Sequence, residues 1–198
     1  MKIYGDIRSG NCYKIKLLAA LLEIPHEWVH VDIMAGATRT AEFLAKNPNG
    51  KIPLLELDDG RYLAESNAIL NYLAAGSDLL PADDYARAQV LQWQFFEQYS
   101  HEPYIAVARF IAKYLGLPEA RKAEYVAKQQ GGHKALAVME DQLARAPYLV
   151  GQRLTIADIS LYGYTHVAHE GGFDLSGYPA INALLARIAA QPQYVGME

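Results

Sequence analysis

The sequence contains a single cysteine, Cys12, among its 198 residues. An intramolecular disulfide and a metal site built on several thiolates are therefore excluded, and a reducing cytoplasm is the expected compartment. No apolar run has the length of a membrane span, and the N-terminus lacks the apolar segment of a signal peptide. We therefore expect a soluble cytoplasmic protein that has no membrane partner.

Basic charge is also scarce, since the sequence has 18 lysines and arginines against 22 aspartates and glutamates, and its net charge is -4. No predicted helix or strand carries a cluster of lysine and arginine, so we expect no nucleic-acid partner. The 6 histidines offer no metal-ligand spacing with a third partner. His26 and His30 are four apart but lie across a turn and a strand, so we expect no metal.

The first third of the chain alternates strand and helix signals, and it predicts an α/β domain of the order β-α-β-α-β-β-α. Its first three elements form a β-α-β unit long enough for a right-handed crossover. The predicted elements are a strand at 2–4, a helix at 11–22, a strand at 27–33, a short helix near 42–46, strands at 53–57 and 61–63, and a helix from 66.

Strand signals vanish after the segment GSDLLPADD (76–84), which is rich in turn-forming residues. We expect an α/β domain at 1–76, a linker at 77–84 and an all-helical domain at 85–198. The predicted helices of the second domain are 85–115, 118–145, 155–170 and 178–190. The pair Gly131-Gly132 is expected to mark a kink or a break, and Thr155 with Asp158 is typical of a structural capping box.

The segment RSGNC (8–12) begins the first predicted helix. The N–H groups of a first helical turn have no partner within the helix, so an anion is stabilised in front of them. Ser9 stands where a two-cysteine redox motif has its nucleophile, and at neutral pH its hydroxyl is a hydrogen-bond donor. The site is suited to stabilising the thiolate of another molecule; the alternative is that Ser9 only caps the helix.

Two further segments carry groups that recognise a peptide. The Ile52-Pro53 bond, directly before a strand, is a candidate cis peptide that would leave the backbone of Ile52 to pair with an extended ligand. Ser66 is predicted to cap a helix whose first N–H groups hold a carboxylate, and Glu65 can hold an ammonium group. The alternatives are an ordinary strand-start proline and an ordinary helix cap.

Four motifs together resemble the soluble glutathione transferase family, and bacterial members in particular. They are SGNCYK (9–14), EFLAKNPNGKIPLLE (42–56), ESNAIL (65–70) and LTIADISLY (154–162). The resemblance covers essentially the whole chain. It implies a thioredoxin-like N-terminal domain, an all-helical C-terminal domain and a homodimer that uses glutathione as co-substrate in detoxification.

The resemblance also implies which residues bind glutathione: Ser9, Asn11, Arg39, Lys51, Ile52, Pro53, Glu65 and Ser66. Glu65 and Ser66 would bind its γ-glutamyl head, and Ile52 would pair with its cysteinyl backbone. Lys51, and less strongly Arg39 or Thr38, would meet its glycyl carboxylate.

The thiolate donor is ranked as Ser9 first, Asn11 second and Tyr4 third, because some members of the family use a tyrosine at the end of the first strand. Cys12 lies about one helical turn inward from Ser9 and is interpreted as a small packing residue. If Cys12 were exposed, it could instead form a mixed disulfide with glutathione.

His101 and Tyr104 share a face of the first long helix, which in the family borders the site of the second, electrophilic substrate. They are candidates for that pocket, and a core-packed or solvated role is the alternative for each. The resemblance implies a glutathione S-transferase that holds the thiolate for attack on a small hydrophobic electrophile. The alternatives are an isomerase, disulfide reductase or dehalogenase on the same fold, or a non-catalytic binding protein.

Overall fold

The computed structural model describes residues 1–197, which form two compact units. The first unit comprises Met1–Ser77 and the segment that begins at Gln191, and the second comprises Asp78–Ala190. The sequence had assigned everything after residue 84 to the helical domain. The end of the chain instead packs with the first unit, where the hydroxyl of Tyr13 donates a hydrogen bond of 2.8 Å to the carbonyl of Val195.

The first unit has the predicted order β-α-β-α-β-β-α. In chain order its elements are β1 (Lys2–Gly5), α1 (Gly10–Leu21), β2 (Glu27–His30), η1 (Ala37–Arg39), α2 (Ala41–Lys46), β3 (Leu54–Glu56), β4 (Tyr62–Ala64) and α3 (Ser66–Leu73). The sheet order is β2-β1-β3-β4, with β1 parallel to β2 and the other pairs antiparallel. This is the mixed sheet of a thioredoxin-like domain.

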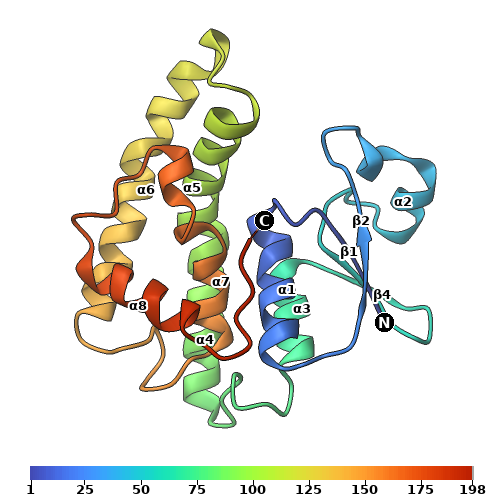
Figure 1. Cartoon of the computed structure of the whole chain (residues 1–198), viewed down its shortest axis with the longest axis horizontal. Coiled ribbons are helices and arrows are strands. Elements are labelled where there is room, and N and C mark those ends of the chain that lie inside the picture. The colour runs from blue at the N-terminus through green and yellow to red at the C-terminus, as the bar shows by residue number, and fades with distance from the viewer. Residues whose placement is uncertain (198) are drawn as a thin grey trace. The chain divides into compact units, whose positions relative to one another are not determined.

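The two faces of this sheet pack against different helices (Figure 1). Helices α1 and α3 lie side by side on one face, and α2 lies on the other. On the α2 face, Tyr4 forms a cluster with Val31, Phe43 and Leu54. On the α1 face, a β-carbon on Gly5 would lie 3.0 Å from the sulfur of Cys12, so the glycine permits the close approach of α1 to β1.

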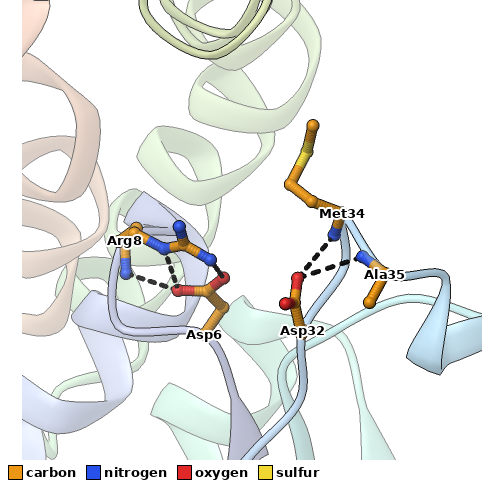
Figure 2. Close-up of polar contacts among 5 residues, drawn as sticks. All are labelled: Asp6, Arg8, Asp32, Met34 and Ala35. Atoms are coloured by element: carbon orange, nitrogen blue, oxygen red, sulfur yellow. Dashed lines mark hydrogen bonds and ion pairs between the residues drawn. The ribbon is translucent and has the colours of Figure 1, made fainter.

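Strand β2 ends at His30, three residues before the predicted end at residue 33. The physical reason is Asp32, whose carboxylate accepts hydrogen bonds from the backbone N–H groups of Met34 at 2.9 Å and Ala35 at 3.1 Å (Figure 2). Such an Asx turn competes with strand pairing for the backbone. The local bonds of Asp32 therefore prevail over the alternating pattern that extended the prediction.

The second unit is helical throughout its regular structure. Its elements are α4 (Asp84–Phe96), η2 (Glu97–His101), α5 (Glu102–Arg109), η3 (Phe110–Tyr114), η4 (Glu119–Arg121), α6 (Lys122–Leu143), α7 (Ile156–Thr165), η5 (Ala168–Gly171) and α8 (Pro179–Ala189). The predicted helix at 85–115 is continuous but contains two π-helical turns, η2 and η3. Pro103 follows η2, and proline lacks the N–H that would bond to the carbonyl of Tyr99 in a regular α-helix.

Helix α6 runs without a break through Gly131 and Gly132, so the expected break between two helices is wrong. The glycines instead make room for aromatic rings, Tyr104 against Gly131 and Phe173 against Gly132. The predicted capping box is confirmed: Asp158 accepts hydrogen bonds from the N–H groups of Thr155 at 2.9 Å and Leu149 at 2.8 Å. Burial raises the pKa of Asp158 to about 6, although these hydrogen bonds act to lower it.

Candidate functional site

The loop between β1 and α1 is held by Asp6, which is 2% exposed. Its carboxylate accepts hydrogen bonds from the backbone N–H of Arg8 at 3.0 Å and from the guanidinium at 3.0 and 2.6 Å (Figure 2). Burial acts to raise the pKa of Asp6, but the bonds from Arg8 outweigh it and the pKa is lowered. The ionised carboxylate thus fixes the loop that delivers Ser9 to the start of α1.

Ser9 occupies the N-cap position of α1, yet within residues 1–197 its hydroxyl accepts no capping hydrogen bond. The alternative role of the hydroxyl, as a helix cap, is therefore not what the structure shows. The side chain is half-buried and lies within hydrogen-bonding reach of the Cys12 thiol. Because a hydroxyl rotates easily, its proton is available to a stronger anionic acceptor in front of the helix.

Cys12 is fully buried beneath Ser9. Burial raises the pKa of this thiol to about 12, so the thiolate, which is the reactive form, is absent at neutral pH. The contact with Gly5 and the burial agree with the predicted packing role. The condition for a mixed disulfide, an exposed thiol, is not met.

Asn11, in the first turn of α1, joins two parts of the predicted site that are far apart in sequence. The hydroxyl of Ser66, the first residue of α3, donates a hydrogen bond of 3.3 Å to Oδ1 of Asn11. The second-ranked thiolate donor, Asn11, and the predicted holder of the γ-glutamyl head, Ser66, are therefore in direct contact. The fold brings the starts of α1 and α3 to one place.

Sequence analysis missed Lys14, one helical turn after Asn11. Its ammonium group donates a hydrogen bond of 2.7 Å to Oδ1 of Asn11, and the residue is 0% exposed. A fully buried lysine is rare and implies a specific partner. The signal in the sequence was a lysine beside the apolar positions Ile15, Leu17 and Leu18 of the predicted helix.

Helix α3 begins at Ser66, and Glu65 is its N-cap, so the predicted cap is displaced by one residue. The first N–H groups of α3 still lie at Ser66, where a carboxylate is stabilised. Glu65 has a backbone φ of +69°, a conformation that side chains other than glycine rarely adopt. Such backbone geometry is concentrated at ligand sites, and here it belongs to an exposed carboxylate.

The Ile52-Pro53 peptide bond is cis, as the sequence predicted. The loop before it is shaped by Asn47, a second residue that sequence analysis missed: its amide donates a hydrogen bond of 2.8 Å to the carbonyl of Lys51. The same side chain accepts one of 3.1 Å from the N–H of Asn49. These bonds hold the segment that carries both Lys51 and Ile52.

Two cations flank this loop. Lys51 is exposed, and Arg39 is exposed on η1 with its guanidinium so close to Gly50 that a β-carbon there would lie 2.8 Å from it. The structure thus brings Arg39 beside Gly50, the residue that precedes Lys51. Thr38 is buried and its carbonyl faces Gly50, so its hydroxyl is less accessible than the two cations.

Tyr4 is directed away from these groups. Its ring lies in the cluster on the α2 face, and its hydroxyl donates a hydrogen bond of 2.5 Å to the Glu56 carboxylate. This bond, together with burial, raises the pKa of Tyr4 above its usual value. A tyrosine that supplies a proton to a thiolate needs the opposite environment, so the structure disfavours the third-ranked donor.

In the second unit, His101 is 0% exposed and its Nε2 lies 2.9 Å from the hydroxyl of Thr165. The proposed pocket role of His101 is therefore corrected to a core role, because a bound electrophile has no access to a fully buried ring. Tyr104 is half-buried, with the ammonium group of Lys128 placed 5.5 Å from the centre of its ring. Its partial exposure leaves it a candidate.

In the part of the chain that is described, residues 1–197, no three histidine, cysteine, aspartate or glutamate side chains are grouped as metal ligands. No helix among those residues combines the length and apolarity required to cross a membrane.

Comparisons with known proteins match both units. Residues 8–75 match the family described as "Glutathione S-transferase, N-terminal domain", and residues 92–192 match "Glutathione S-transferase, C-terminal domain". A solved glutathione S-transferase from Pseudomonas fluorescens Pf-5 is 65% identical, with a TM-score of 0.98 over 99% of this chain and 98% of that chain.

Two further relatives carry a different activity in their names. A maleylacetoacetate isomerase from Rhizobium meliloti (strain 1021) is 33% identical over 94% of this chain and 90% of its own length. A solved maleylacetoacetate isomerase from Methylobacterium extorquens AM1, with malonate and GSH bound, is 27% identical, with a TM-score of 0.82 over 98% of this chain and 94% of that chain.

Proposed function

Because the chain belongs to the glutathione S-transferase family, we propose that it binds glutathione at the starts of α1 and α3 and holds the sulfur as a thiolate for attack on a small hydrophobic electrophile. The observation that carries the proposal is the hydrogen bond of 3.3 Å between Ser66 and Asn11. It joins the residues expected at the two ends of a γ-glutamyl-cysteinyl unit.

The amino-acid head of glutathione would bind at the start of α3. Its carboxylate would accept a hydrogen bond from the N–H of Ser66 and a second from the Ser66 hydroxyl, whose one proton would turn from Oδ1 of Asn11 to the carboxylate when glutathione binds. Its ammonium group would pair with Glu65. The cysteinyl backbone would pair with Ile52 ahead of Pro53. The glycyl carboxylate would meet Lys51 and Arg39, the two exposed cations beside Gly50.

The sulfur would lie before the first turn of α1, where Ser9 and Asn11 supply hydrogen bonds and the helix N-terminus supplies positive potential. A free thiol has a pKa of about 8.5. Lowering that pKa by about two units requires about 2.7 kcal/mol, which one or two charge-assisted hydrogen bonds and the helix terminus can provide. The rest of the rate would come from holding the thiolate next to the electrophile, with no covalent enzyme intermediate.

The test is a titration of glutathione into the wild type and Ser9→Ala, with the ultraviolet absorbance of the thiolate followed against pH. We expect the wild type to bind glutathione and to lower its thiol pKa, and Ser9→Ala to bind it with less lowering. Binding with an unchanged thiol pKa in the wild type would contradict the transferase mechanism and favour a disulfide-handling or binding role.

An isomerase is the second candidate function, because a relative of 33% identity is named maleylacetoacetate isomerase. Both activities require the same thiolate and differ only in the second substrate, for which Tyr104 is the remaining candidate contact. Turnover of an aryl halide compared with turnover of a cis-olefinic dicarboxylate would separate them. We further propose that the protein is a cytoplasmic homodimer, which sedimentation at micromolar concentration would test.

A further inference from the structure

The orientation of the Asn11 amide follows from the chemistry of its neighbour. The Lys14 ammonium group has three N–H donors and no acceptor, so the Asn11 atom 2.7 Å from it is the carbonyl oxygen. The hydroxyl of Ser66 donates to the same oxygen at 3.3 Å. Two donors thus occupy Oδ1, and the amide nitrogen with its two N–H groups lies on the opposite side of the side chain.

Burial makes this arrangement rigid. Lys14 is 0% exposed, so its side chain is held by packing and its ammonium group stays beside Oδ1. Asn11 itself is half-buried, which leaves part of its side chain accessible. A positive charge next to the carbonyl oxygen polarises an amide and makes its N–H groups stronger donors, and the effect is larger in an interior of low dielectric constant.

We propose that Lys14 is a positioning residue for the glutathione thiolate and that it acts through Asn11, by fixing the amide so that Nδ2 donates to the sulfur. The inference rests on the proposed function and deepens it. The negative charge on sulfur is stabilised by an oriented and polarised amide, and this stabilisation is withdrawn when the thiol is protonated. Lys14 therefore changes the balance between thiol and thiolate and not the binding of the glutathione backbone.

The test uses three single variants of the full chain. Lys14→Met keeps the length of the side chain without its charge, and Lys14→Arg keeps the charge and the donors. Lys16→Met is the matched control, since Lys16 is a partly exposed lysine on the same helix. The measurements are the pH titration of thiolate absorbance for bound glutathione and the affinity for S-methylglutathione, which has no ionisable thiol.

We expect Lys14→Met to raise the thiol pKa of bound glutathione by about one unit, a tenfold loss in the ratio of thiolate to thiol near neutral pH. Its affinity for S-methylglutathione should stay within twofold of the wild type. Lys14→Arg should restore most of the lowered pKa, and Lys16→Met should match the wild type. A folded Lys14→Met that titrates like the wild type would overturn the proposal.

Asn11→Asp provides a second test, in which the buried Lys14 is retained. The substitution keeps an oxygen for Lys14 and Ser66 but replaces the N–H donors with a second oxygen, so the thiol pKa of bound glutathione should rise by more than one unit. An unchanged pKa in this variant would also overturn the proposal. If the wild type itself leaves the thiol pKa unshifted, the proposed function fails first, and the two failures are therefore distinguishable.

Discussion

The aromatic ring of Tyr104 occupies the space that a side chain on Gly131 would need: a β-carbon there would lie 2.2 Å from the ring. Gly131 lies inside α6, where alanine would ordinarily be more favourable by about 1 kcal/mol. The close packing of α5 on α6 outweighs this helix propensity. The glycine is therefore explained by a tertiary contact.

Gly131→Ala should lower the free energy of unfolding by about 2 kcal/mol, because the rigid ring must move and such overpacking outweighs the gain in helix propensity. Urea denaturation measures the change. In a Tyr104→Ala background the same substitution should cost nothing or be stabilising. Gly177→Ala, where no atom lies within 4 Å of the new carbon, is the control. Equal costs at positions 131 and 177 would contradict the packing explanation.

Ser66→Ala and Ser9→Ala should affect different steps. Loss of the Ser66 hydroxyl removes a hydrogen bond to the carboxylate of the γ-glutamyl head, which is worth about 1 to 2 kcal/mol, so affinity for S-methylglutathione should fall about tenfold. Ser9→Ala should leave that affinity nearly unchanged and raise the thiol pKa of bound glutathione. Calorimetric titration with S-methylglutathione separates the two effects. A loss of affinity in Ser9→Ala equal to that in Ser66→Ala would show that the assignments are wrong.

Cys12 should be unreactive in the folded protein, because it is fully buried and its thiol pKa is raised to about 12. A chromogenic disulfide reagent at neutral pH should modify the native chain only at the rate of unfolding, and should modify its single thiol at once in denaturant. Cys12→Ala should retain glutathione binding. Rapid modification of the native protein would restore the mixed-disulfide alternative.

His166 should make stability depend on pH. Burial lowers its pKa to about 4 in the folded chain, from a usual value of 6.5. Between these values the unfolded chain binds more protons, so the free energy of unfolding falls as pH is lowered from about 6.5 to about 4, by up to about 3 kcal/mol from this group. Denaturation midpoints across this range should show the fall in the wild type.

The fall should be smaller in His166→Gln, whereas His169→Gln should change it little, because the charge of the exposed His169 is the smallest of the influences on the pKa of His166. Other titrating groups, such as Asp158, remain in every one of these proteins and cancel in the comparison. Identical pH profiles for the wild type and His166→Gln would contradict the lowered pKa of this half-buried histidine. A proton NMR titration of the His166 ring provides an independent value for its pKa.

Local patterns were sufficient for the order of elements, for the capping box at Thr155 and for the cis bond at Ile52-Pro53. Each of these depends on residues within a few positions of one another, through hydrophobic period, capping geometry or the chemistry of proline. The end of β2 was missed because the carboxylate of Asp32 bonds to its own turn. The competition between this turn and strand pairing is also local, but the alternation of apolar and polar residues does not reveal it.

The sequence by itself determined the fold class and the chemical types of the residues at the site. Both depend on the spacing of residues that are close to one another in the chain. Only the tertiary structure decided which side chains meet: Ser66 with Asn11, Tyr4 with Glu56, and His101 with Thr165. These partners are separated by 52 to 64 residues. No local pattern encodes such a pair, since the distance between them depends on how whole helices and strands pack.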